Sequence, residues 1–391
     1  MRILKSTYLS DGKQFNDGRP VELIRIEDDL DFDVLLDNII HSNYYDSSYF
    51  NQHIDYREGR IKFDAFYLAS IIKSFKPKSV LELGCGRGDV LFLLGSDNKI
   101  AVRGIEFSQD ALTMSWPTLT GKVDCGDVLE VCRKSHSQKT SFDTLCAFDL
   151  WEHLLPKRLH EYIEGLVALA EKDALFFFTI PAFGEDRVFG EPFPLEFEEN
   201  RDSFNRRMPF NFLIVESKNP LIPVKGHLIC AHSKWWEKQF KRHGLIRAEE
   251  LEKNIHTYFD EHLFYARKSF YIFHLDSKEG QRRVNRLTKK SLTLYRKWKL
   301  LVDLQEDIGR FIKNQEKSFI DLEELKLTIH HAEFYMTQDL KKRIEWWTGK
   351  LLPQAKTGVG DQPLPSLLDK LAFKCLDAYI RLSRKRHYRF H

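Results

Sequence analysis

The sequence lacks the segments that carry a protein across or out through a membrane. Its first residues, MRILKSTYLSDGK, include no apolar run long enough for a signal peptide. No window of about 18 apolar residues, enough to span a bilayer, occurs anywhere in the chain. We therefore expect a protein that neither crosses a membrane nor leaves the cell by the usual route.

Cysteines are few and are not spaced for disulfides or metal ligands. The six contain no CxxC pair and no Cys/His metal spacing, and they stand at positions 85, 125, 132, 146, 230 and 375. Buried or free thiols in a reducing compartment are the expected outcome. We expect a cytoplasmic protein without a metal, since no HxH or acidic metal cluster is evident either.

Basic and acidic residues are nearly balanced, with 60 Lys and Arg against 57 Asp and Glu. The net charge of +3 over 391 residues is too small to indicate nucleic-acid binding by itself. With 42% hydrophobic and 30% charged residues, the composition is that of a soluble globular protein. The length allows one large domain or two modest domains with a real core.

Three glycines, at positions 84, 86 and 88, end the apolar run in VLELGCGRGD. A residue without Cβ lets the backbone approach a ligand closely and tolerates positive φ. A P-loop would require Gly-Lys-Ser/Thr where Arg87-Gly88-Asp89 stands. The dinucleotide fingerprint would need a glycine at Asp89, whose charge would repel a pyrophosphate. The pattern thus indicates a ligand with a nucleoside but no phosphate.

Short β-rich runs alternate with helical stretches from about residue 79 to 275, as in a parallel sheet with helices on both faces. The expected strands are 79–84, 100–107, 142–149, 174–180 and 269–275, and the expected helices are 88–95, 108–115, 157–171 and 233–243. Residues 181–225 interrupt this alternation. Because they are long, proline-bearing and rich in phenylalanine, we expect a lid or substrate-binding insertion, with a connector that packs its own small core as the alternative.

Acidic residues follow successive strands at the edge where open α/β sheets bind ligands. Glu106 closes the second strand, where a carboxylate can accept two hydrogen bonds from a ribose diol. Asp127 follows the third strand, where a carboxylate beside a backbone amide suits an adenine edge, although a helix N-cap or turn residue is the alternative. Asp149 closes the fourth strand, and Trp151, Glu152 and His153 stand just behind it.

With these residues the sequence resembles the class I S-adenosylmethionine-dependent methyltransferases, whose first motif looks like VLELGCGRGD and whose signature after the fourth strand looks like FDLWEHL. The resemblance covers about residues 44–275. It implies an α/β fold, a Rossmann-like doubly wound and mostly parallel sheet, here with a C-terminal helical extension. On this reading residues 1–62 are an N-terminal segment that partly closes over the cofactor, and residues 63–275 are the methyltransferase domain.

The resemblance also implies which residues hold S-adenosylmethionine. Glu82, Gly84 and Gly86 would face its methionine and ribose parts, and Glu106 would take the ribose hydroxyls. Asp127 and Val128 would face the adenine, and Phe148 or Asp149 would form the floor beneath the methyl group. The aromatic stretch SNYYDSSYF, with Tyr44, Tyr45 and Tyr49, resembles the N-terminal segment that closes over the cofactor; simple packing is the alternative.

A hydroxyl acceptor needs its proton removed, and three histidines are candidates for the base. His153, just past the fourth strand, is the first choice because its ordinary pKa suits the task. The alternative is a histidine that merely packs or hydrogen-bonds at a helix start. His227 and His232, in GHLICAHSKWW, are the rivals, whereas Trp235 and Trp236 are expected in the core.

Absent motifs narrow the acceptor. The (N/D)PP(Y/F) motif of enzymes that methylate exocyclic amines is replaced here by Asp149-Leu150-Trp151-Glu152, and no Pro-Cys pair offers a thiolate for cytosine C5. Nucleic acid is therefore not expected as a partner. O-methylation of a sugar or glycan is the leading expectation, by general similarity to methyltransferases found with bacterial envelope polysaccharide enzymes. A small metabolite or lipid-linked intermediate is the alternative acceptor, and a non-catalytic scaffold is the alternative from another class.

No proline occurs between Pro223 and Pro353, and a heptad frame that begins with Val284 and Leu287 runs through residues 284–340. Residues 276–352 are thus expected to form long helices, either a coiled coil that joins copies of the chain or a bundle folded on the sheet domain. Residues 353–365 are read as a linker. Residues 366–391 form an amphipathic pattern with a net charge of +5, against −2 for the rest, which favours an anionic membrane surface at the inner face of the membrane.

Overall fold

The computed structural model describes residues 1–5, 22–53, 63–95, 99–183, 198–259 and 269–291. Met1–Leu292 form one compact unit. Residues 293–391, which include most of the heptad frame, the linker and the basic tail, lie outside the described residues. Among the helices that are described, none is both long enough and apolar enough to span a bilayer.

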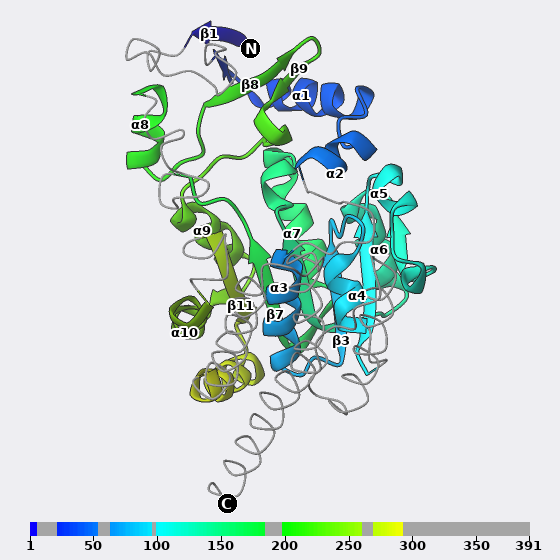
Figure 1. Ribbon diagram of the computed structural model, residues 1–391. Coiled ribbons are helices and arrows are strands. Elements are labelled where there is room, and N and C mark those ends of the chain that lie inside the picture. Colours follow the sequence, from blue (N-terminus) through cyan, green and yellow to red (C-terminus); the bar gives the residue numbers. More distant parts are fainter. Residues whose placement is uncertain (6–21, 54–62, 96–98, 184–197, 260–268, 292–391) are drawn as a thin grey trace, which may run out of the picture. The chain divides into compact units, whose positions relative to one another are not determined.

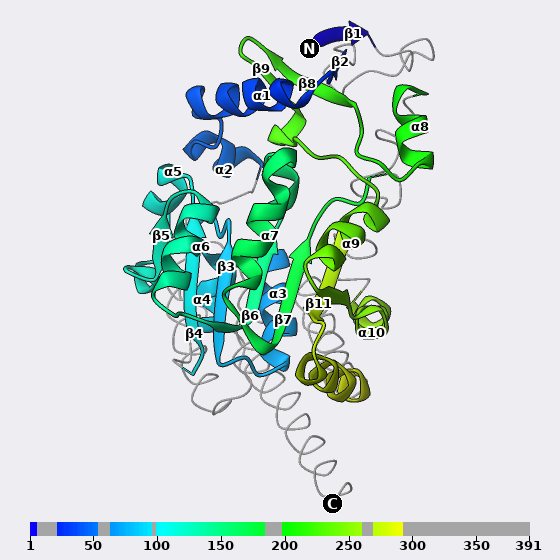
Figure 2. The ribbon, with the colours of Figure 1, turned by 180° about the vertical axis from the view of Figure 1, so that it is seen from behind.

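The main sheet has seven strands in the order β10-β11-β7-β6-β3-β4-β5 (Figures 1 and 2). They are β3 (Ser79–Leu83), β4 (Ala101–Glu106), β5 (Val123–Cys125), β6 (Phe142–Phe148), β7 (Ala170–Thr179), β10 (Leu245–Arg247) and β11 (Phe270–Leu275). β5, β4, β3, β6 and β7 are parallel, whereas β11 pairs antiparallel with both β7 and β10. The mostly parallel Rossmann-like sheet expected from the sequence is confirmed.

Helices cover both faces of this sheet. α6 (Val128–Ser137), α7 (Leu159–Val167) and α9 (Ser233–Arg242) share one buried cluster with β3, β6, β7 and β11, and this face is turned toward the viewer in Figure 2. α3 (Phe63–Ser74) and α4 (Asp89–Gly95) lie in front of the sheet in Figure 1, with α4 packed on β4. Successive side chains of β7 point to opposite faces of the sheet. Phe176 and Phe178 enter that cluster, whereas the ring of Phe177 stacks on Phe75 with the two ring centroids 5.7 Å apart.

A second sheet of four antiparallel strands, in the order β1-β2-β8-β9, was not expected from the sequence. β1 (Arg2–Lys5) and β2 (Glu22–Arg25) come from the N-terminal segment, and β8 (Phe212–Lys218) and β9 (Leu221–Pro223) from the expected insertion. β2 pairs with β8 through Leu23 opposite Ile214. The insertion therefore stays outside the main sheet, as expected, but its described part joins the N-terminal segment in a sheet of its own.

The second sheet packs its own core with the N-terminal helix. Ile24, Leu35 and Ile39 are buried with Leu213, Val215 and Ile222 in a cluster separate from that of the main sheet. Leu35 and Ile39 lie four residues apart on α1 (Asp29–His41), which begins at Asp28 because its carboxylate accepts bonds from the Leu30 and Asp31 amides at 2.9 and 3.2 Å. The insertion therefore shares this core with the N-terminal segment.

Several shorter elements complete the unit. They are α2 (Ser47–His53), α5 (Gln109–Thr113), α8 (Glu198–Asn205), α10 (Glu249–Phe259) and the short helical turns η2 (Pro117–Leu119), η3 (Trp151–His153), η4 (Pro156–Arg158) and η5 (Val224–Gly226). The expected helix 157–171 is shorter than the sequence suggested, since α7 ends at Val167 and β7 already begins at Ala170. Trp236 is fully buried in the main core, and Trp235 packs against it.

Residues 278–291 are helical and belong to the compact unit. Val284 and Leu287, which begin the heptad frame, are buried there. Arg283 is 6% exposed and donates to the carbonyls of Asp143 and Asp173 at 2.8 and 3.0 Å. The start of the frame thus packs on the sheet domain, while the residues that would decide between a coiled coil and a bundle lie outside the described part.

Candidate active site

A cavity of about 620 Å³ opens where β3, β4 and β6 end. All eight residues predicted to hold the cofactor line it, namely Glu82, Gly84, Gly86, Glu106, Asp127, Val128, Phe148 and Asp149. His153 and His227 line it as well, together with the three tyrosines of the N-terminal segment. The topology therefore brings residues from six separate stretches of sequence to one place.

The glycine turn after β3 forms one wall of the cavity. Gly84, Gly86 and Gly88 have φ values of +62°, +54° and +82°, the left-handed region that other residues seldom adopt. The amides of Gly84 and Cys85 both donate to the Ile105 carbonyl, at 2.8 and 3.2 Å, which folds the turn toward β4. Asp89, next to it, is buried and held by Arg87 at 3.0 Å and by the Trp116 indole at 2.6 Å.

Glu106 fixes the turn to the end of β4. Its carboxylate accepts hydrogen bonds from the Gly86 amide at 2.6 Å and the Ser108 amide at 2.7 Å. Burial raises the pKa of Glu106, and these backbone amides act in the opposite direction. A carboxylate oxygen accepts more than one hydrogen bond, so Glu106 keeps acceptor capacity for a diol in the cavity.

Glu82 is buried near the end of β3, just before the turn. Within the described part of the chain, its Oε2 has no hydrogen-bond partner. Burial, and then the charges of Asp89 and Glu106, raise the pKa of Glu82 well above its ordinary value. A buried carboxyl without a partner is costly, and a ligand ammonium group would supply the missing donor.

Asp127 caps a helix and also lines the cavity. Its Oδ1 accepts from the amides of Leu129 and Glu130 at 2.9 and 3.2 Å, so it is the N-cap of α6. The same side chain lines the cavity next to Val128. Asp149, at φ +50°, accepts from the Thr179 hydroxyl at 2.9 Å and thus ties the ends of β6 and β7 together.

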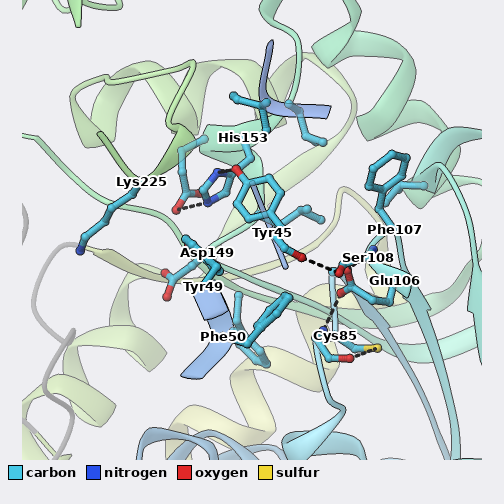
Figure 3. Close-up of a pocket in the computed structure, with 18 of the residues that line it drawn as sticks. Tyr45, Tyr49, Phe50, Cys85, Glu106, Phe107, Ser108, Asp149, His153 and Lys225 are labelled. Atoms are coloured by element: carbon cyan, nitrogen blue, oxygen red, sulfur yellow. Dashed lines mark hydrogen bonds and ion pairs between the residues drawn. The ribbon is translucent and has the colours of Figure 1, made fainter. Parts of the chain in front are cut away.

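The N-terminal aromatic segment lies against the cavity. Tyr44, Tyr45 and Tyr49 contact one another with ring centroids 5.0 to 5.2 Å apart. The Ser108 hydroxyl donates to the Tyr45 carbonyl at 2.7 Å, which fastens this segment to β4, and Figure 3 shows that bond beside Glu106. The Tyr44 hydroxyl donates to Glu216 on β8 at 2.8 Å. The segment thus links the second sheet to the cofactor end of the main sheet.

Glu152, His153 and His227, here called the buried triad, gather at another part of the same cavity. Glu152 Oε1 lies 3.8 Å from His153 Nε2 and 3.9 Å from His227 Nε2. The two imidazole rings are 4.8 Å apart. His153 Nδ1 lies 2.8 Å from the Tyr45 hydroxyl, as Figure 3 shows, and 3.3 Å from the Gly226 carbonyl.

Burial sets the protonation states of the triad. It lowers the pKa of His153 to about 4 and raises the pKa of Glu152 well above its ordinary value, where Asp149 adds to the effect. The pKa of His227 is also lowered, first by burial and then by His153 and Lys225. Both imidazoles are therefore neutral near pH 7, and each can offer a nitrogen lone pair.

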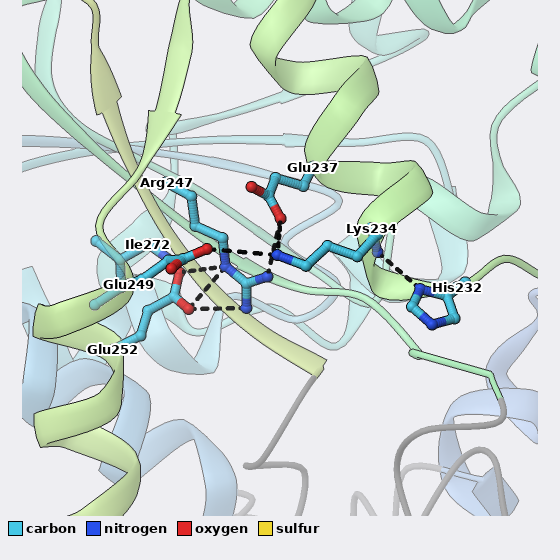
Figure 4. A network of polar contacts seen from close by, with 7 residues as sticks. All are labelled: His232, Lys234, Glu237, Arg247, Glu249, Glu252 and Ile272. Atoms are coloured by element: carbon cyan, nitrogen blue, oxygen red, sulfur yellow. Dashed lines mark hydrogen bonds and ion pairs between the residues drawn. The ribbon is translucent and has the colours of Figure 1, made fainter. Parts of the chain in front are cut away.

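His232, the third predicted base, has a structural role. It is not among the residues that line the cavity, and its Nδ1 accepts from the Lys234 amide at 3.0 Å as the N-cap of α9. Figure 4 shows this cap near a polar network in which Arg247 contacts Glu252 at 2.8 Å and Glu252 accepts from the Ile272 amide at 2.7 Å. This places His153 and His227, but not His232, at the cavity.

Sequence reasoning gave no function to Glu152, Ser108 or Thr179. Glu152 stands next to His153 in the DLWEH stretch, so its position was visible, but its contact with His227 depends on how the insertion returns to the sheet. The backbone supports that return, because the amides of Leu228 and Ile229 both donate to the Glu152 carbonyl, at 2.7 and 2.9 Å. Ser108 follows Glu106 by two residues, and its hydroxyl caps α5.

Residues 56–216 match a protein-family profile described as a methyltransferase domain. Among solved structures, the chain is similar to an S-adenosylmethionine-dependent methyltransferase from Clostridium acetobutylicum, with 12% identity over 60% of this chain and 99% of that one and a TM-score of 0.36. It is also similar to the CcbJ methyltransferase from Streptomyces caelestis, with 15% identity over 57% of this chain and 94% of that one and a TM-score of 0.37.

An O-methyltransferase family protein from Burkholderia thailandensis is similar over 54% of this chain, with 13% identity and a TM-score of 0.36, and the match spans just over half, 55%, of that protein's length. A comparison with curated proteins finds no match. The family profile identifies residues 56–216 as a methyltransferase domain, and the cavity lies among these residues and their neighbours in the fold. The unsatisfied Glu82 and the positive-φ glycines fit S-adenosylmethionine as the cofactor.

Proposed function

We propose that this protein methylates a hydroxyl group of a sugar or glycan, and that the proton of this hydroxyl is removed at the buried triad. When bound, S-adenosylmethionine supplies a methyl group on a positively charged sulfur. The observation that supports the proposal is the single cavity that joins the glycine turn and Glu106 to Glu152, His153 and His227. Its volume, about 620 Å³, lies in the range of ligand sites in proteins.

The residues of the chain divide the work within that cavity. Glu82, Glu106 and Asp127 all line the cavity, and we assign their carboxylates to the ammonium, the ribose and the adenine of the cofactor. The three tyrosines of the N-terminal segment form one side of the cavity. By keeping water out, they would strengthen each polar contact inside. In this proposal the acceptor hydroxyl loses its proton at the triad, because a hydroxyl is a poor nucleophile until that proton is removed.

A hydroxyl acceptor fits the triad better than an amine. A neutral amine already carries the lone pair that attacks, so it would not need two neutral imidazoles beside a carboxylate. A sugar presents hydroxyls as its commonest reactive groups, and this favours it among acceptors. A small metabolite or a lipid-linked intermediate with a free hydroxyl is the alternative.

The test incubates the full chain with methyl-labelled S-adenosylmethionine and four separate sets of acceptors: free sugars, soluble glycans, lipid-linked sugars and small hydroxylated metabolites. Labelled sugar or glycan product, with the label on oxygen by mass spectrometry, is the expected result. The His153→Ala variant should lower that rate by roughly 10²- to 10⁴-fold while cofactor affinity stays close to that of the wild type. Label that appears only on metabolites would replace the sugar assignment with its alternative.

If none of the four acceptor sets becomes labelled, a second measurement is needed to interpret the result. Calorimetry with S-adenosylmethionine separates an enzyme that lacks the right acceptor from a non-catalytic scaffold. If S-adenosylmethionine binds tightly, the protein remains assigned as a methyltransferase and only the tested acceptors are rejected. If it does not bind at all, the proposed activity is rejected.

A further inference from the structure

We propose that the buried triad binds a divalent transition-metal cation, and that the acceptor hydroxyl completes the coordination of this cation. Each member of the triad offers one donor atom, and these three atoms all lie within 4.8 Å of one another. Two imidazole nitrogens and one carboxylate oxygen are a ligand set that first-row divalent cations take in proteins, with further positions left open. The sequence spacing did not indicate a metal, because the fold alone brings His227 to Glu152.

The carboxylate of Glu152 is the strongest single observation. The side chain is completely buried, and within the described part of the chain neither of its oxygens has a hydrogen-bond partner. Leaving both oxygens without a donor is expensive whether the group is charged or neutral. A cation between Glu152 and the two imidazoles would satisfy this carboxylate directly.

The outer contacts of His153 support the same interpretation. A histidine that binds a metal through one nitrogen almost always donates the N–H of its other nitrogen to a carbonyl or similar acceptor. His153 Nδ1 has the Gly226 carbonyl at 3.3 Å and the Tyr45 oxygen at 2.8 Å, while its Nε2 faces Glu152. With a proton on Nδ1, the Nε2 lone pair is free to bind the cation.

The three donor atoms, all within 4.8 Å of one another, must move closer together to coordinate one cation. With metal–ligand distances of about 2.0 to 2.2 Å, donor atoms of a tetrahedral or octahedral site lie roughly 3.0 to 3.5 Å apart. The distances from Glu152 Oε1 to the two histidine nitrogens are 3.8 and 3.9 Å. Side-chain rotations of Glu152 and the histidines would have to close the difference, and no hydrogen bond within the described part of the chain holds the Glu152 carboxylate in place.

The role in the reaction rests on the proposed function. A bound cation lowers the pKa of an oxygen ligand, so it would take the place of a protein base. The O–H bond of the acceptor would break, its proton would pass to water and the electron pair would stay on the oxygen. As this oxygen attacks the methyl carbon, the bond between that carbon and the cofactor sulfur would break, and its electron pair would stay on the sulfur, which becomes a neutral thioether. His153 and His227 serve in this scheme as ligands. A sugar with two neighbouring hydroxyls could fill two of the open positions.

The test titrates chelator-treated full-length protein with Co²⁺ and follows visible absorption and heat. Wild type should bind one equivalent. Glu152→Gln and His227→Asn should each weaken binding by at least about 10-fold. His232→Asn is the matched control, because asparagine can still cap α9 and this side chain lies outside the cavity, so Co²⁺ binding should not change. Affinity for S-adenosylmethionine checks that each variant is folded.

The outcomes separate this inference from the proposed function. Absence of Co²⁺ binding by the wild type, or equal binding by Glu152→Gln and His227→Asn, overturns the metal site. If sugar methylation then proceeds undiminished in chelator, the proposed function stands with a histidine as base. If Co²⁺ binds as expected while no sugar or glycan is methylated, the proposed acceptor fails and the metal site stands.

Discussion

Glu106 holds both the backbone and, by our assignment, the ribose. Its two oxygens accept from Gly86 and Ser108, so removing the carboxylate loosens the turn as well as the ligand contacts. Glu106→Ala should weaken S-adenosylmethionine binding by about 2 kcal/mol, measured by calorimetry. Glu161→Ala removes a half-exposed carboxylate that pairs with Arg133 outside the cavity, so it is the control and should bind normally. If Glu106→Ala binds S-adenosylmethionine as tightly as the wild type, the ribose assignment is wrong.

His243 makes stability depend on pH. Its side chain is 11% exposed, and its Nε2 lies 2.7 Å from His160 Nδ1. Burial and the nearby His160 lower the pKa of His243 below its ordinary value of 6.5. The unfolded chain therefore binds a proton more readily, so this contribution to stability is complete above pH 6.5 and is lost as the pH falls.

Urea unfolding at pH 7.5 and 5.5 measures this effect. The wild type should lose more stability over that interval than His243→Gln, which has no imidazole to protonate. Because His153 and His227 remain in both proteins, the difference between the two slopes isolates His243. Identical slopes would contradict the prediction.

Single residues show where sequence reasoning succeeds and where it ends. Gly84, Glu106 and Asp127 were predictable because each follows a strand in a fixed order along the chain. Glu152 was not, since its significance depends on His227, which returns from a distant segment. His232 could not be separated from His227 by sequence, because only the start of α9 shows that its side chain caps a helix.

At the scale of one element, substitutions of Asp127 at the start of α6 can distinguish its role as a helix cap from its expected role in cofactor binding. Asp127→Ala should lower the free energy of unfolding by about 1 kcal/mol through the lost N-cap. Asp127→Ser should restore most of that stability, since serine caps as well, but should not restore cofactor affinity if the carboxylate meets the adenine. Thermal unfolding without ligand and calorimetry with S-adenosylmethionine measure the two effects. Normal affinity in Asp127→Ser would leave the aspartate as a cap only.

The strands differ in how well the sequence revealed them. β3, β6 and the second half of β7 are largely buried and rich in apolar residues, so they were predicted. β5 and β10 have only three residues each, too few for a periodic signal, and their place is set by pairing with β4 and β11. β1, β2, β8 and β9 depend on partners far along the chain, and no local pattern announces such pairing.

At the scale of the whole chain, the C-terminal residues 366–391 remain a prediction about location. They combine an apolar stripe with a net charge of +5, and each basic residue near anionic lipid contributes about 1 kcal/mol. Liposomes that contain anionic lipid should carry the full chain upward in a flotation gradient at low salt. A chain that ends at Leu352 should stay in the soluble fraction, and flotation in high salt should be weaker for the full chain.

Neutral liposomes are the control for this experiment. If the full chain and the truncated chain both stay soluble with anionic liposomes, the membrane prediction is wrong. The tail would then serve packing or association of copies, and sedimentation of the two chains would distinguish these by their masses.

The pairing of β2 with β8 bears on the order in which the molecule folds. Leu23 lies opposite Ile214, so nearly the whole cofactor-binding half must be made before these strands can meet. Closing so long a loop is slow and entropically unfavourable until other contacts have shortened it. We therefore expect the glycine turn and β3 to β6 to form early during synthesis, and the tyrosine-bearing segment to settle last. A chain stalled on the ribosome before residue 212 should then hold the five parallel strands β3 to β7, while β2 still lacks its partner β8.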